Sequence, residues 1–125
     1  MEKTMTDSEI IAIIKHCRIA LIYVDLVKRR HRDRSICCCD FAKMAAQLLN
    51  GKIIKGNIVV EGTYGKFGVK TGKKWKEKMY HEWVEFDSKI VDGSADQFNV
   101  FGDFQFPEII FAPYSAYPQY RHPLC

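Results

Sequence analysis

The sequence predicts an α+β fold in which N-terminal helices pack on an antiparallel sheet. Residues 7 to 50 carry apolar side chains at helical spacing, whereas residues 52 to 92 are rich in β-branched residues and include an alternating hairpin pattern. With 125 residues, of which 47% are hydrophobic, the chain fits one domain spanning 1–125.

The first element predicted is a long amphipathic helix. Thr6 followed by Glu9 resembles a capping box, which satisfies the free backbone N–H groups of a helix start. Apolar residues then recur on one side, at Ile10, Ile13, Ile14, Cys17, Leu21, Val24 and Val27. Since such a stripe is typical of core packing, we expect a structural role for this helix.

A second helix is expected from Cys38 to Leu49 or Asn50. Its buried side should carry Phe41, Ala45, Leu48 and Leu49. The pair Asn50-Gly51 suits a C-terminal cap, where a left-handed backbone is needed.

Strands should follow the second helix. Residues 52–55 and 57–61 favour one bent strand or two short ones. The segments 80–86 and 89–91 alternate around Asp87-Ser88, which indicates a hairpin. One further strand is expected at 108–112, with the rest of the tail irregular.

Between Gly62 and Lys78 lie four glycines and many lysines, which predict a mobile loop or an extended hairpin close to His81. It could gate the site or contact an acidic partner. The segment lacks a Walker-type pattern, so we expect no phosphate site. The basic run from Lys28 to Arg34 is typical of a solvated loop, with nucleic-acid binding as the minority alternative.

The sequence favours a cytoplasmic protein without a membrane span. The apolar segment from Ile10 to Val27 is interrupted by charged residues, and the acidic N-terminus does not fit a secretory signal. Five cysteines, three of them consecutive, do not suit a disulfide framework, so we expect reduced thiols.

Cys38, His81 and Asp92 are the candidate catalytic residues. At a helix start, unpaired backbone N–H groups favour the thiolate form of Cys38 and can stabilise an oxyanion. A turn near Asp87-Ser88 places residues 81–84 across from residues 92–95, which brings His81 and Asp92 together. Asp92 would then orient the imidazole while its other nitrogen faces the thiol.

The same residues carry a family resemblance. Cys38-Cys39-Asp40-Phe41-Ala42 resembles the Cys-x-Asp-Phe-Ala helix start of the transglutaminase-like superfamily. Residues 81–85 are similar to its His-x-Trp-x-Glu strand, and residues 90–94 to its Asp-x-Ser segment. This resemblance implies a papain-like core and selects Cys38, with Cys39 as the alternative nucleophile.

No glutamine precedes Cys38, so the side-chain oxyanion donor of papain-type enzymes has no counterpart. Tyr80 and Trp83 are our candidates to assist the backbone N–H of Cys38 in that role.

These observations predict a thiol-dependent amide hydrolase, either a cysteine protease or a protein glutamine deamidase, that works on protein substrates through an acyl-enzyme and without a cofactor. Acyl transfer to an amine, as in a transglutaminase, and a non-catalytic binding module on the same fold are alternatives. A zinc site built from the cysteines with His81 and either His31 or Cys125 is the competing chemistry, although structural zinc prefers spaced cysteine pairs.

Overall fold

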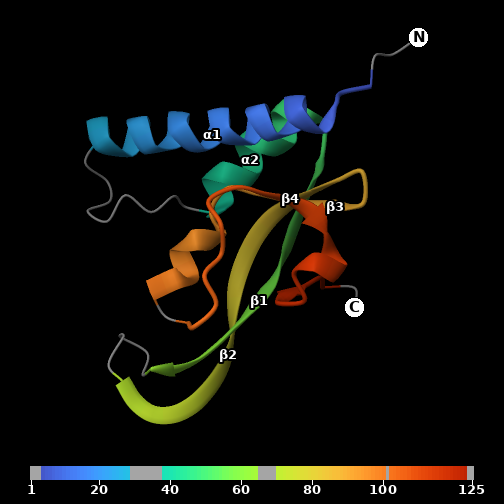
Figure 1. Ribbon diagram of the computed structural model, residues 1–125. Helices are drawn as coiled ribbons and strands as arrows, with labels where there is room; N and C mark the ends of the chain where they lie inside the picture. Colours follow the sequence, from blue (N-terminus) through green and yellow to red (C-terminus); the bar gives the residue numbers. More distant parts are fainter. Residues whose placement is uncertain (1–3, 29–37, 65–69, 101, 124–125) are drawn as a thin grey trace.

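The computed structural model describes residues 4–28, 38–64, 70–100 and 102–123. Within these ranges it contains two α-helices and a curled antiparallel sheet of five strands (Figure 1). The predicted α+β class, with N-terminal helices on an antiparallel sheet, is therefore confirmed.

Helix α1 (Asp7–Lys28) begins at the predicted capping box. The backbone N–H of Glu9 donates to Oγ1 of Thr6 at 3.2 Å, and the backbone N–H of Thr6 donates back to the Glu9 carboxylate at 3.2 Å. Two of the orphan donors of the helix start are thereby satisfied. Ile10, Ile14 and Cys17 are buried, as the apolar stripe predicts.

Helix α2 (Cys38–Leu49) has the predicted bounds. It ends at Asn50, whose φ of 56° is the left-handed conformation expected of the cap. The expectation that Leu48 is buried is wrong, since 52% of this residue is exposed. The buried stripe runs through Ala42, Ala45 and Leu49, and Leu48 lies at its edge.

The sheet has the strand order β4-β3-β2-β1-β5, with antiparallel neighbours throughout. The strands are β1 (Lys52–Tyr64), β2 (Lys70–Phe86), β3 (Lys89–Asp92), β4 (Ile110–Pro113) and β5 (Tyr120–Arg121). The turn between β2 and β3 lies at Asp87 and Ser88, with φ of 55° and 59°. Two successive positive φ values match the right-handed twist of a two-residue hairpin, so the predicted turn is confirmed.

Strands β1 and β2 form a long curved hairpin that corrects the expected position of His81 and confirms one of the two forms expected of residues 62–78. His81 does not begin a strand but lies well inside β2, where it pairs with Gly56 of β1. Of the segment 62–78, the described part is an extended hairpin arm, which is one of the two predicted forms, and it runs away from both helices (Figure 1). Residues 65–69 of this segment lie outside the described residues.

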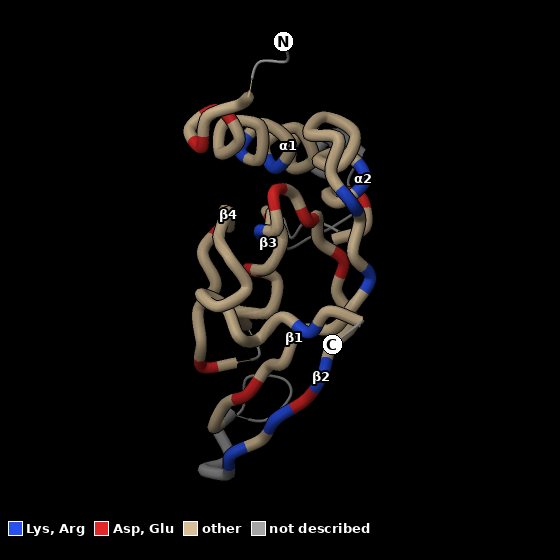
Figure 2. The backbone as a smooth tube through the Cα atoms, turned by 90° about the vertical axis from the view of Figure 1, so that its right-hand side faces the viewer, with Lys and Arg blue, Asp and Glu red and all other residues tan. Residues whose placement is uncertain are grey.

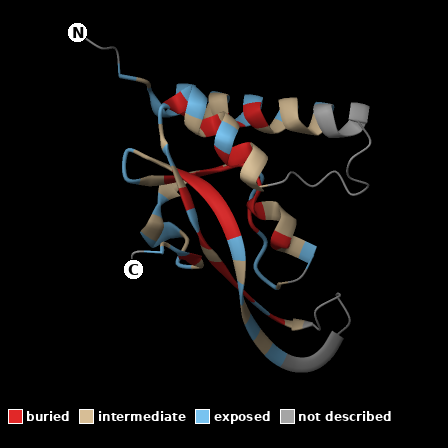
Figure 3. Ribbon diagram, turned by 180° about the vertical axis from the view of Figure 1, so that it is seen from behind, coloured by how far each residue is buried: buried red, intermediate tan, exposed pale blue. Residues whose placement is uncertain are grey.

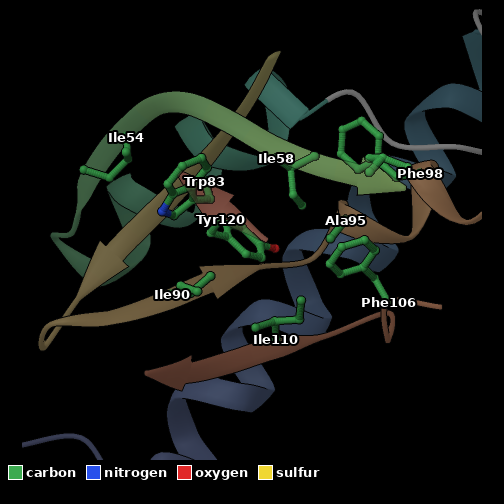
Figure 4. Close-up of a cluster of buried hydrophobic side chains, with 10 residues drawn as sticks. Ile54, Ile58, Trp83, Ile90, Ala95, Phe98, Phe106, Ile110 and Tyr120 are labelled. Atoms are coloured by element: carbon green, nitrogen blue, oxygen red, sulfur yellow. The ribbon is translucent and has the colours of Figure 1, made fainter. Parts of the chain in front are cut away.

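The two faces of the sheet pack against different cores, and the central strands are buried from both sides (Figure 3). One face, with Val84 and Val91, packs against the helices through Ile14, Phe41 and Ala45. The opposite face packs against the tail, in a cluster of ten buried residues: Ile54, Ile58, Val60, Trp83, Ile90, Ala95, Phe98, Phe106, Ile110 and Tyr120 (Figure 4).

The tail is more ordered than the sequence suggests. The strand expected at 108–112 is β4, which starts two residues later, at Ile110. Two 3₁₀ turns (Ala95–Val100 and Tyr114–Ala116) and strand β5 complete it. Strand β5 pairs with β1 and forms the edge of the sheet opposite β4. No helix in the described part of the chain is long and apolar enough to cross a membrane.

Candidate functional site

The structure brings His81 and Asp92 together in the interior. Nε2 of His81 lies 2.6 Å from Oδ2 of Asp92, and both side chains are completely buried. The hairpin register explains the pairing. Val84 lies opposite Val91, and continuing the pattern puts Asp92 opposite Trp83 and diagonal to His81 on the same face.

Three further donors hold the Asp92 carboxylate. Oδ1 accepts from the backbone N–H and from the hydroxyl of Ser94, at 2.8 Å and 2.9 Å. Oδ2 also accepts from the hydroxyl of Tyr120, at 2.6 Å. Together with His81 these donors satisfy both oxygens, so the carboxylate is fixed in position and in ionisation state.

The charges of this pair reinforce one another. Burial acts to raise the pKa of Asp92, but the adjacent His81 charge and the donated hydrogen bonds hold that pKa below its usual value. Burial acts to lower the pKa of His81, but the Asp92 carboxylate outweighs it and, with Cys38, raises the pKa to about 9. Imidazolium and carboxylate are therefore the favoured forms at neutral pH.

The second ring nitrogen of His81, Nδ1, takes no part in the contact with Asp92. Nδ1 is buried and has no aligned hydrogen-bond partner in the described part of the chain. Cys38 is nevertheless close enough to raise the pKa of His81 through hydrogen bonding and through its charge. The thiol and the ring are thus neighbours whose contact is not an aligned hydrogen bond, which is a common arrangement before a substrate is bound.

Helix geometry favours Cys38 over Cys39. Cys38 is the first residue of α2, and positions 38, 42, 45 and 49 fall on the side of the helix that is buried. Cys39 is rotated away from that side by about 100°. Both thiols are partly exposed, and Cys38 is among the groups that raise the pKa of His81.

Aromatic rings enclose the His81 imidazole. Trp83 stacks on it with ring centroids 6.0 Å apart and planes 27° from parallel. Phe98 meets it edge-on at 5.1 Å, and Tyr120 at 6.0 Å. These rings keep water away from the ring face and fix its orientation, which strengthens its interaction with Asp92.

The two proposed oxyanion donors are already engaged. The indole N–H of Trp83 donates to the hydroxyl of Tyr114 at 3.0 Å, so it positions the His81 ring rather than offering a proton to a substrate. The hydroxyl of Tyr80 donates to Glu82 at 2.8 Å, and this bond, above all, raises the pKa of Tyr80 to about 12. Tyr80 is exposed, and the charges of Cys38 and Cys39 also raise its pKa, so both thiols lie within electrostatic range of its hydroxyl.

Arg18 of α1 clamps the loop that follows Asp92. Its guanidinium donates to the carbonyl of Gly93 at 2.9 Å and, through two nitrogens, to both carboxylate oxygens of Asp96 at 2.9 Å and 2.8 Å. The backbone N–H of Ser94 donates to the Asp92 carboxylate, and Arg18 binds the chain just before Ser94, at Gly93, and just after it, at Asp96. Arg18 therefore fixes the Asp92 carboxylate indirectly, through the backbone of this loop.

Sequence reasoning missed Arg18, Ser94 and Tyr120. Ser94 could have been found, because an Asp followed two residues later by Ser is a pattern for a local side-chain turn. Arg18 and Tyr120 are 74 and 28 positions away from Asp92 in the sequence, so only the tertiary fold places them there.

Within the described ranges, no group of three or more His, Cys, Asp or Glu residues could hold a metal ion. The zinc alternative involved Cys37, His31 and Cys125, which lie outside those ranges. Residues 29–34 of the basic run, for which nucleic-acid binding was the alternative, also lie outside the described ranges.

Comparisons with protein-family models, with curated proteins and with solved structures give no match. The transglutaminase-like resemblance therefore rests on this chain's own sequence motifs.

Proposed function

We propose that this protein is a thiol-dependent amide hydrolase with a papain-like, transglutaminase-like core. Cys38 is the nucleophile, His81 carries the proton and Asp92 orients His81. The observation that supports this proposal most is the buried His81–Asp92 pair. The other ring nitrogen of His81, Nδ1, lacks an aligned partner, and Cys38 is close enough to raise the pKa of the same ring.

In the proposed reaction the Cys38 thiolate attacks the amide carbonyl carbon, and the resulting oxyanion is stabilised by backbone N–H groups at the start of α2. His81 then donates its Nδ1 proton to the departing nitrogen, and the C–N bond breaks to leave a thioester. Water attacks the thioester while His81 takes up one of its protons, and the C–S bond breaks to regenerate the thiolate and release a carboxylic acid, which loses its proton to solvent. Asp92 stays ionised throughout and stabilises the imidazolium.

Peptide cleavage and glutamine deamidation share these steps, and a transglutaminase differs only in replacing water by an amine. We propose a cysteine protease or deamidase of proteins as the main function. A cytoplasmic location accords with this function, since a nucleophilic thiol must stay reduced. The products separate the activities. New amino termini indicate proteolysis, free ammonia alone indicates deamidation, and an amine joined to the substrate indicates transfer.

Alkylation by iodoacetamide tests the site without a known substrate. Cys38 should be alkylated well before Cys17, because Cys38 is partly exposed at a helix start whereas Cys17 is buried. A variant with Ser at positions 37 and 39 leaves Cys38 as the single thiol of its cluster. In that background His81→Gln should slow alkylation by about tenfold or more.

The matched control is His16→Gln, which removes an exposed histidine of α1 and should leave the rate unchanged. Equal rates for the His81→Gln variant and its parent would reject the catalytic site and favour the non-catalytic binding module.

A further inference from the structure

The hairpin arm of β1 and β2 has one strongly basic face. Along β2, Lys74, Lys76 and Lys78 are exposed, whereas the intervening Trp75 and Glu77 are half-buried. Side chains alternate between the faces of a strand, so the three lysines lie on one face. Basic segments recur along this arm in Figure 2.

Neighbouring strands extend the same face. Asn57 of β1 pairs with Tyr80 on one side and with Arg121 of β5 on the other, which puts the exposed Arg121 on this face. Lys55 follows, opposite Glu82. We define the basic face as Lys55, Lys74, Lys76, Lys78 and Arg121. Among its described neighbours two carboxylates belong to the same face, the exposed Glu61 and the buried Glu82, so cations predominate.

The basic face leads to the candidate nucleophile. Continuing along β2, the next residue on this face after Lys78 is Tyr80, which is 59% exposed and lies within reach of the charges of Cys38 and Cys39. From Lys74 to Tyr80 the strand rises by about 20 Å, at about 3.3 Å per residue. A polypeptide lying along the face would therefore pass from the lysines directly to the thiol.

We propose that the basic face binds an acidic polypeptide segment in an extended conformation and directs it to Cys38. Lysines at alternate positions repeat about every 7 Å, which is the spacing of carboxylates at alternate positions of an extended chain. The proposal rests on the proposed function, because amide chemistry at the thiol is what favours a polypeptide over a nucleic acid as the occupant.

Binding can be tested in a Cys38→Ser variant, which keeps the face and prevents turnover. The probe is a fluorescein-labelled decapeptide with glutamates at alternate positions, and its isomer with the glutamates in one block has the same charge. Fluorescence anisotropy should show tighter binding of the alternating peptide, with an affinity that falls as salt is added.

Changing Lys74, Lys76 and Lys78 to Gln should weaken binding of the alternating peptide by about tenfold. This is the loss in affinity expected when three exposed ion pairs, each weak by itself, are removed together. The control removes the same charge from Lys15, Lys43 and Lys52, which are exposed outside the basic face. It should change affinity by less than about twofold, because distant charges are screened.

In the wild-type protein, saturating alternating peptide should slow alkylation of Cys38 by iodoacetamide, since the segment would cover Tyr80. Equal losses in the two triple variants, equal affinities for the two peptides, or an unchanged alkylation rate would overturn the proposal. If a ten-nucleotide thymidine strand binds more tightly than the alternating peptide, and the Lys74, Lys76 and Lys78 variant loses that binding, the proposal is overturned in favour of a nucleic acid. Fast alkylation of Cys38 together with absent peptide binding would reject this inference alone and leave the amide hydrolase standing.

Discussion

Asp92→Asn tests the central ion pair by removing its charge while keeping its shape. The pKa of His81 rises from 6.5 to about 9 in the folded protein, although burial alone would lower it. At about 1.4 kcal/mol per pH unit, this difference corresponds to about 3 kcal/mol of stability. Because the folded pKa lies above the unfolded value, this stability is complete below pH 6.5 and is lost as the pH rises through about 9.

Urea unfolding between pH 6 and pH 9.5 measures this contribution. The wild-type protein should lose about 3 kcal/mol across that range, whereas Asp92→Asn should start about 3 kcal/mol lower at pH 6 and change little. Asp87→Asn is the matched control, since Asp87 is exposed in a turn whose positive φ suits asparagine. It should follow the wild-type curve. Parallel curves for Asp92→Asn and the wild type would show that the pair is not an ion pair.

The remaining predictions concern the supports of Asp92. Tyr120→Phe removes one donor to the carboxylate and should lower the free energy of unfolding by about 1.5 to 3 kcal/mol. Urea unfolding at pH 7 measures this loss, and a value below about 0.5 kcal/mol, which is typical of a surface substitution, would contradict the prediction. Arg18→Met should lower the free energy of unfolding by a similar amount. Arg18→Lys should restore less than half of that loss, because lysine cannot bind both oxygens of Asp96 as the arginine guanidinium does. Full stability in Arg18→Lys would refute this reason. Gly93→Ala should cost about 1 to 3 kcal/mol in thermal or urea unfolding, since its Cβ would lie 2.5 Å from the Phe41 ring, and unchanged stability would show that the ring moves freely.

Local signals in the sequence predict the parts of this fold that short-range forces determine. The Thr6 capping box, the helix from Cys38 to Leu49 and the turn at Asp87-Ser88 each depend on residues within four positions of one another. The contact between His81 and Asp92 was predictable for the same reason, because one tight turn sets the register that joins them.

What the sequence could not predict depends on long-range pairing. The strand at Tyr120 has two residues, too few to give a pattern, and it exists because the edge of β1 is free to pair with it. The first half of β2 is rich in lysine and glycine, so the sequence left a loop and a hairpin arm equally open there. The pairing with β1 decides between them in favour of a strand.

The burial of His81 is itself an argument for function. A fully buried histidine whose Nδ1 lacks an aligned partner leaves a polar group unsatisfied, which costs about 1 to 3 kcal/mol. Burying the Asp92 charge adds a desolvation penalty that four hydrogen-bonding contacts, from His81, Ser94 and Tyr120, are arranged to offset. An apolar pair of similar volume would fill the same space and is often as stable or more so. A charged ring held rigidly, with the first residue of α2 near enough to raise its pKa, is instead what proton transfer to and from a thiol requires.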